Sequence, residues 1–474
     1  MDALTAWLEK YILPIAGRIG AQKHLVALRD AFIGTLPATM AGSVAVMLNA
    51  ILRDLPPQFF EGYDGNSIPV ISQIIAINGY VWNGTLAVAG LIFVFSWGYN
   101  LARAYGVNEL AGGIVATASS IAGITFSFAG EITGLNLDQS TIDAININEA
   151  GWTATATGIS ATGWGWLPLN NLDSNFFFTA MIIGFVSTVI YAKLMLANIT
   201  IKLPDTVPPA VSKAFASIIP ATVAIYAVSI FYWAFSLIFP GMTFLAWLQE
   251  TIALPLLGLS QGFGAVILAT LFVQIFWFFG IHGPNVLAPI LEGVFGVAQL
   301  ENVNLFQEGG AELVIAEGYN WVRGSFDAYA WFGGSGGTIV LIIALLLFSK
   351  RSDYKTVGKL SVGPGIFNIN EPLMFGLPIV LNPIMFIPFL LAPVVSVSIG
   401  YFATIWGLVN PVSQQVAWVT PPFLLSFLAT GADWRAPIVT LVAFVASFLI
   451  WIPFVIAANK MDPALGEEEM KKAE

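Results

Sequence analysis

One glutamate, Glu371, is the only charged residue between positions 360 and 432. Asn368 and Asn370 precede it, and Pro372 follows it directly. A carboxylate without a nearby cation can accept a proton or a ligand hydroxyl, and carboxamides both donate and accept hydrogen bonds. Proline disfavours helix at the residue before it and frees backbone groups there. We therefore expect the tip of a re-entrant hairpin at this point, although an ion pair with Arg323 or Arg435 is an alternative role for Glu371.

A second candidate site lies where the aromatic run 276–279 gives way to Gly280-Ile281-His282-Gly283-Pro284-Asn285. Glycine and proline cost a helix interior about 1 and 3 kcal/mol. We expect the helix to break here and to present His282, Gly283 and Asn285. An ionisable group among apolar residues is a functional candidate, although His282 could instead cap the helix by bonding a neighbouring carbonyl. His24, the other histidine, lies among charges and is expected at the surface.

The elements that position these residues are expected to be membrane helices. Of the 474 residues, 57% are hydrophobic and 10% are charged, and the mean hydropathy is +0.80. So few charges could not cover a soluble chain of this size. The chain contains no cysteine, which excludes a disulfide framework and a thiolate nucleophile, and a single histidine in the membrane is too few for a metal site. No basic stripe indicates nucleic acid binding, and we expect neither a metal nor a cofactor.

The apolar stretches are about twenty residues long, which fits helices that span a bilayer. They lie near 31–52, 80–101, 110–130, 176–197, 217–239, 260–280, 326–348, 378–406 and 436–457. With both termini in the cytoplasm, all 18 lysines and arginines except Arg53, Arg323 and Arg435 fall on cytoplasmic segments. We therefore predict an all-α polytopic protein of the cell membrane, with about ten transmembrane helices.

Composition also predicts the domain organisation. Residues 1–30 read as an amphipathic cytoplasmic segment, 31–240 as an N-terminal bundle, 241–460 as a half rich in broken helices, and 461–474 as a cytoplasmic tail. The stretch 131–175 holds five acidic residues and no basic one, and it is expected to form an extracellular loop with short strands or turns.

The motif Asn368-Ile369-Asn370-Glu371-Pro372, with Phe375-Gly376-Leu377-Pro378-Ile379 and Asn382-Pro383, resembles that of a family of sugar permeases. These are the enzyme IIC components of the lactose/cellobiose/diacetylchitobiose family of the phosphotransferase system. The histidine break and Arg29-Asp30-Ala31-Phe32 are similar to the same family, and the resemblance covers nearly the whole chain. The long 131–175 segment departs from the family's general pattern.

The resemblance implies a homodimer of ten spans and two re-entrant hairpins, with the N-terminal half as scaffold and dimer interface. The C-terminal half would bind one disaccharide, which receives a phosphoryl group at its 6-hydroxyl during import. The donor would be a phosphocysteine of a separate IIB protein. Glu371 and His282 are the expected catalytic residues, although the sequence leaves open which of them is the base. The expected substrate-binding residues are Trp277, Gly283, Asn285, Asn368, Asn370 and Trp418. Trp418 has an equal claim as an anchor at the membrane interface.

The sequence also allows other classes of protein. An ion-coupled secondary sugar transporter would share the broken helices and the membrane carboxylate. A membrane hydrolase or transferase acting alone would need a nucleophile–base pair or a metal cluster, which the sequence does not offer.

Overall fold

The computed structural model describes residues 21–459, except positions 55, 59, 61, 149, 150, 205, 378, 380 and 381. The predicted cytoplasmic tail and most of the predicted segment 1–30 lie outside these residues. The last part of that segment belongs to helix α2, which begins at Lys23 and continues without a break past position 30. The boundary between the segment and the bundle therefore falls inside a helix.

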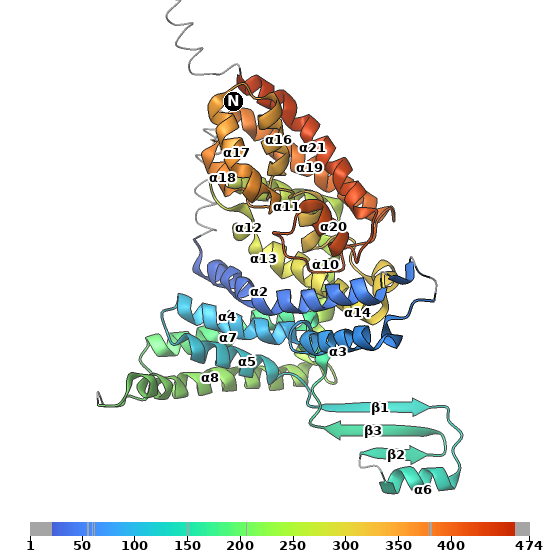
Figure 1. Ribbon diagram of the computed structural model, residues 1–474. Coiled ribbons are helices and arrows are strands. Elements are labelled where there is room, and N and C mark those ends of the chain that lie inside the picture. Colours follow the sequence, from blue (N-terminus) through green and yellow to red (C-terminus); the bar gives the residue numbers. More distant parts are fainter. Residues whose placement is uncertain are drawn as a thin grey trace, which may run out of the picture.

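The first half of the chain forms a helical bundle with α2 on its upper side (Figure 1). Its helices are α2 (Lys23–Asn49), α3 (Pro69–Asn83), α4 (Ala89–Ala104), α5 (Glu109–Ile121), α7 (Phe177–Leu196) and α8 (Pro209–Ile238). Small residues allow α4 and α5 to approach closely, since a Cβ added at Gly98 would lie 2.5 Å from the carbonyl oxygen of Gly112. The other face of α2 is turned toward the C-terminal half (Figure 1).

A small mixed unit extends from this bundle between α5 and α7 (Figure 1). It contains strands β1 (Ser127–Thr133), β2 (Trp152–Thr155) and β3 (Gly158–Trp164) and helix α6 (Gln139–Asn148). The strands pair antiparallel in the order β1-β3-β2. The prediction of an all-α fold is therefore incomplete, because the chain also contains a small sheet. The strands expected in the acidic loop are present. The span predicted at 110–130 is too long, because α5 ends at Ile121 and β1 follows.

The C-terminal half consists of short and broken helices around a few long ones. They are α9 (Phe244–Leu248), α10 (Leu254–Ser260), α11 (Phe263–Phe278), α12 (Gly283–Val286), α13 (Ala288–Ile290), α14 (Val297–Glu317), α15 (Arg323–Tyr329), α16 (Thr338–Phe348), α17 (Ser352–Ile366), α18 (Glu371–Gly376), α19 (Pro383–Ile405), α20 (Pro422–Ala429) and α21 (Ala436–Ala458). Residues 326–348 do not form one span, because a glycine-rich turn separates α15 from α16. Turns of 3₁₀ and π helix complete the chain; among them are η1 (Ala50–Asp54), η7 (Gln249–Ala253) and η8 (Leu291–Gly296).

Within the described residues, six helices are long and apolar enough to cross a membrane. A seventh span is possible if the pair Phe244–Ser260 and Phe263–Phe278, bent by 75°, counts as one. The chain is thus a mostly helical membrane protein, and the count of ten spans stays a prediction.

Side-chain carboxamides hold the irregular segments of the C-terminal half together. Gln261 donates to the carbonyl of Trp321 at 3.0 Å and accepts from its N–H at 2.8 Å. Asn302 donates to the carbonyl of Tyr319 at 2.8 Å and accepts from its N–H at 2.7 Å. It also donates to the carbonyl of Val412 at 2.8 Å. An unpaired peptide group away from water is costly, so these amides replace the hydrogen bonds that a helix would supply.

We expect Gly98→Ala to destabilise the bundle by about 1 to 3 kcal/mol, because its methyl group would meet the α5 backbone. The control is Gly79→Ala in α3, where a Cβ would have no atom within 4 Å. The measurement is the thermal unfolding midpoint of each purified variant in detergent. Equal midpoints would contradict the close α4–α5 approach.

Candidate functional site

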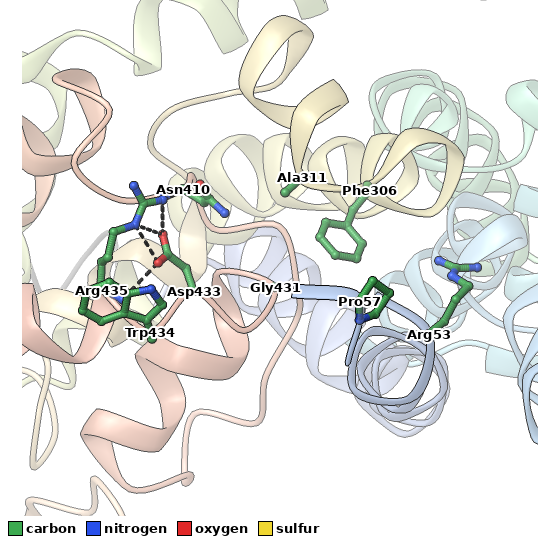
Figure 2. Close-up of a pocket in the computed structure, with 10 residues that line it drawn as sticks. Arg53, Pro57, Phe306, Ala311, Asn410, Gly431, Asp433, Trp434 and Arg435 are labelled. Atoms are coloured by element: carbon green, nitrogen blue, oxygen red, sulfur yellow. Dashed lines mark hydrogen bonds and ion pairs between the residues drawn. The ribbon is translucent and has the colours of Figure 1, made fainter. Parts of the chain in front are cut away.

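Two cavities lie beside α2 and the turns that follow it. The first has a volume of about 630 Å³ and lies where α2 continues into η1; Figure 2 shows its lining residues Arg53, Pro57, Phe306 and Trp434. The second has a volume of about 400 Å³ and extends along α2 from Arg29 to Thr39. We call them the outer and the inner cavity. The inner cavity contains both candidate catalytic residues.

The inner cavity lies between α2 and the broken helices of the C-terminal half. From the predicted site it is lined by His282, Asn285, Asn368, Asn370, Glu371 and Trp418. The structure therefore brings together the glutamate motif and the histidine break, which are far apart in the sequence. Arg29, Thr35 and Thr39 form the wall that α2 contributes.

His282 stands at the break between α11 and α12. Its Nδ1 accepts a hydrogen bond from the backbone N–H of Asn285 at 3.2 Å, so the side chain caps α12. This bond requires an unprotonated Nδ1 and assigns the proton of a neutral imidazole to Nε2. His282 thus caps a helix, but through the N–H of Asn285 and not through a neighbouring carbonyl as considered from the sequence. The bond holds the ring at the cavity wall with Nε2 as its remaining polar atom.

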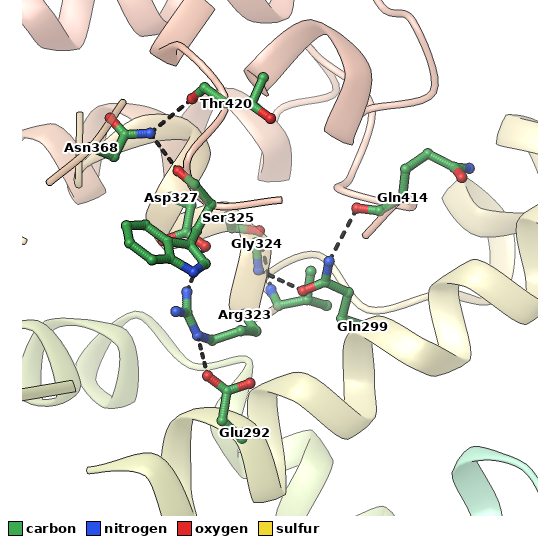
Figure 3. Close-up of polar contacts among 11 residues, drawn as sticks. Glu292, Gln299, Arg323, Gly324, Ser325, Asp327, Asn368, Gln414 and Thr420 are labelled. Carbon is green, nitrogen blue, oxygen red and sulfur yellow. Dashed lines mark hydrogen bonds and ion pairs between the residues drawn. The ribbon is translucent and has the colours of Figure 1, made fainter. Parts of the chain in front are cut away.

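Asn368 holds the loop before Glu371 in place (Figure 3). Its Oδ1 accepts from the N–H of Gly333 at 2.7 Å, and its Nδ2 donates to the carbonyls of Trp418 and Thr420 at 2.6 and 2.8 Å. Its φ of 61° lies in the left-handed region, which asparagine tolerates better than most residues. Asn370 similarly donates to the carbonyl of Ser335 at 2.9 Å. Both amides therefore support the cavity wall with the hydrogen bonds that were expected to bind a ligand.

Glu371 is the first residue of α18, and its side chain is exposed. Among the described residues it has no recorded hydrogen bond or ion pair with another side chain. Arg323 and Arg435, its possible partners, are paired elsewhere: Arg323 with Glu292 and Asp327, and Arg435 with Asp433. The carboxylate is therefore available to a ligand in the inner cavity.

The structure gives the two tryptophans different positions. Trp418 is 48% exposed and lines the inner cavity. Trp277 is 1% exposed and does not line it; its ring centroid lies 4.7 Å from that of His282. Gly283 is also buried, and a Cβ there would lie 2.1 Å from the carbonyl oxygen of Val273. Trp277 and Gly283 thus support the histidine from behind, whereas Trp418 can face a ligand.

A charged cluster in the same cavity was not predicted from the sequence. Arg323 donates to Glu292 and to Asp327, both at 2.8 Å (Figure 3). Its guanidinium lies 4.9 Å from the ring centroid of Trp331. The sequence signal for this cluster was Arg323 itself, which is one of the three basic residues that lie outside the predicted cytoplasmic segments. The other two, Arg53 and Arg435, line the outer cavity.

The described residues contain no group of three or more histidine, cysteine, aspartate or glutamate side chains that could hold a metal ion. The cavity instead offers one carboxylate, one imidazole, several amides and an exposed indole, which suit a ligand with many hydroxyl groups.

Comparison with known proteins agrees with this geometry. The family model described as "Phosphotransferase system, EIIC" matches residues 29–393. The chain belongs to the EIIC family of the phosphotransferase system. The resemblance predicted from the glutamate and histidine motifs is confirmed.

Individual EIIC proteins are similar over their full length. The cellobiose-specific EIIC component of Lactococcus lactis subsp. lactis (strain IL1403) is 48% identical, covering 98% of this chain and 99% of the relative. The oligo-beta-mannoside-specific EIIC component of Bacillus subtilis (strain 168) is 32% identical, covering 98% and 96%. The crystal structure of ChbC, the IIC component from the N,N'-diacetylchitobiose-specific phosphotransferase system, matches with a TM-score of 0.83 at 30% identity, covering 97% of this chain and 99% of ChbC.

We expect Asn368→Gly to lower the stability of this EIIC chain by about 2 kcal/mol, because the buried N–H of Gly333 and the partly buried carbonyls of Trp418 and Thr420 lose their partner. Glycine accepts the positive φ, so the loss reports the amide and not the backbone. Sugar affinity should fall as well, since Trp418 is no longer held. The measurements are the thermal midpoint and sugar binding of the purified variant.

Asn198→Gly is the matched control, because Asn198 also has a positive φ, of 57°, but is exposed and distant from the cavity lining. If both variants lose stability equally, the hydrogen bonds of Asn368 do not hold the site.

Proposed function

We propose that this EIIC chain imports a disaccharide of the cellobiose class and presents its 6-hydroxyl for phosphorylation by a separate IIB protein. The 48% identity to a cellobiose-specific relative supports cellobiose over lactose and diacetylchitobiose, which remain the nearest alternatives. The observation that carries the proposal is that Glu371, His282 and Trp418 meet at one cavity large enough for a small sugar.

In the proposed reaction, the sulfur–phosphorus bond of the phosphocysteine breaks as the sugar O6–phosphorus bond forms. The proton of the 6-hydroxyl passes to the carboxylate of Glu371, which has no cationic partner among the described side chains. His282 would orient the hydroxyl through its Nε2. Phosphoryl transfer depends mostly on positioning and on stabilising charge. Arg29, which α2 contributes to the cavity and which pairs with Asp30 at 2.6 Å, would help to offset the charge of the incoming group.

The domain roles belong to this proposal. Residues 31–240 would form the scaffold and dimer interface, and 241–460 the substrate-binding transport domain. The breaks at His282 and Glu371 would be the tips of two re-entrant hairpins in a ten-span homodimer, with both termini cytoplasmic. The long helix α8 supports an interface with lipid or a second copy, since it exposes apolar side chains along its length; these include Val211, Phe215, Ile218, Tyr226, Ile230, Trp233 and Leu237.

Glu371→Gln should abolish phosphorylation of the sugar while the protein still binds it, because an amide keeps the shape of the carboxylate but does not take up the proton.

His282→Ala should reduce phosphorylation or sugar affinity by at least about tenfold, as expected for a positioned acid–base group. Both are measured with the purified variants, phosphorylated IIB and labelled cellobiose.

The control is His24→Ala. His24 bonds to the hydroxyl of Tyr105 at 2.9 Å and does not line the inner cavity. Wild-type rates in Glu371→Gln, or equal losses in the two histidine variants, would refute these assignments.

Accumulation should depend on the phosphate donor and not on an ion gradient. Vesicles loaded with phosphorylated IIB are expected to trap sugar phosphate at the same rate after ionophores collapse the proton and sodium gradients. Loss of uptake with the donor still intact would move the protein into the class of ion-coupled secondary transporters.

A further inference from the structure

The outer cavity plays no part in the proposed reaction, but its size and lining fit a ligand. Its volume of about 630 Å³ falls in the range of small-molecule sites. Trp434, which is 62% exposed, lies on one side, and Phe306 and Pro57 lie on the other (Figure 2). Phe306 is 2% exposed, so Trp434 is the aromatic side chain whose face can stack against the apolar side of a sugar ring.

Beside Trp434, a polar network orders the wall of the outer cavity (Figure 2). Asp433 accepts hydrogen bonds from Arg435 Nη2 at 2.8 Å and from the backbone N–H of Asn410 at 2.9 Å. Arg435 Nη2 also donates to Oδ1 of Asn410 at 3.0 Å. No hydrogen bond to a described residue is recorded for Nη1 of Arg435 or Nδ2 of Asn410, and both are donors suited to hydroxyl oxygens.

The charge balance of this network favours a neutral ligand. Burial acts to raise the pKa of Asp433, but the hydrogen bonds from Arg435 and from backbone N–H groups hold that pKa below its usual value. Asp433 is therefore ionised at neutral pH and balances the guanidinium of Arg435. Arg53 adds a second positive charge to the lining. The exposed side chains of Glu308 and Glu312, on α14 next to the lining residues Gly310 and Ala311, offset it, so the formal charges around the cavity do not favour an anion.

The outer and inner cavities share two walls. Helix α14 contributes Gln299 to the inner cavity and Phe306 to the outer one, two turns or about 10 Å further on. The loop after α19 contributes Asn410 to the outer cavity and Gln415 to the inner one. The inner cavity lies along α2 from Arg29 to Thr39, and the outer cavity lies beyond the end of α2, at Arg53 and Pro57. In the proposed topology the outer cavity faces away from the cytoplasm.

We propose that the outer cavity is a second sugar site, which binds the neutral disaccharide before it reaches the inner cavity. Trp434 stacks on a sugar ring, and Arg435 and Asn410 donate hydrogen bonds to its hydroxyls. This inference rests on the proposed function, which supplies the class of sugar and the direction of import.

The test compares the two membrane faces. In right-side-out vesicles with phosphorylated IIB inside, Trp434→Ala should raise the KM for cellobiose uptake about fivefold, as expected for loss of one stacking contact. In inside-out vesicles, with sugar and phosphorylated IIB added to the cytoplasmic face, the KM for phosphorylation should be unchanged. Trp434→Phe should restore most of the uptake.

Trp406→Ala is the matched control, since Trp406 is 69% exposed, lies shortly before Asn410 and does not line the outer cavity. Equal uptake KM values for the two alanine variants, or an equal rise for Trp434→Ala on both membrane faces, would overturn the second site. A wild-type protein that neither imports nor phosphorylates cellobiose would instead refute the proposed function.

Discussion

The architecture of the C-terminal half depends on satisfying peptide groups away from water without a continuous helix. Asn368 is the clearest case, because one amide side chain joins the turn after α15, the loop before α20 and the approach to Glu371. Gln261, Gln299 and Asn302 bind other irregular segments in the same way. Each carboxamide presents a donor and an acceptor in the geometry of a peptide, so it can complete a hydrogen-bonding pattern that the backbone leaves open.

This constraint also decides which groups remain to recognise a sugar. Asn368 and Asn370 donate hydrogen bonds to backbone carbonyls, and Nδ1 of His282 accepts a hydrogen bond from the first turn of α12. The carboxylate of Glu371, the exposed side chain of Asn285 and the indole of Trp418 retain more capacity for a ligand. The site is thus built as a supporting layer of amides and buried aromatic rings behind a small number of presented groups.

The membrane class and the two helix breaks could be predicted from the sequence, because each rests on a local cost. That Glu371 and His282 share one site followed only from the family resemblance, since they lie 89 positions apart. Glycine and proline clustered within a few residues are costly in a helix interior, although single prolines such as Pro37 and Pro220 lie inside continuous helices. An isolated carboxylate among apolar residues is a functional candidate. The cluster of Glu292, Arg323 and Asp327 could not be predicted, since η8 and α15 come together only through tertiary packing. Burial of Trp277 behind His282 likewise depends on how tightly α11 and α12 pack, which hydropathy does not encode.

One edge of the small sheet beyond the bundle is covered by an amide side chain. Asn146 in α6 donates to the carbonyl of Ala154 at 3.2 Å and accepts from its N–H at 2.7 Å, so its amide occupies the place of a neighbouring strand beside β2. Since β3 is central, β1 is the edge at which a further strand could add. Two copies of the sheet could therefore pair through their β1 strands. Because Asn146 occupies the β2 edge of each copy, such a pair would not extend into a filament.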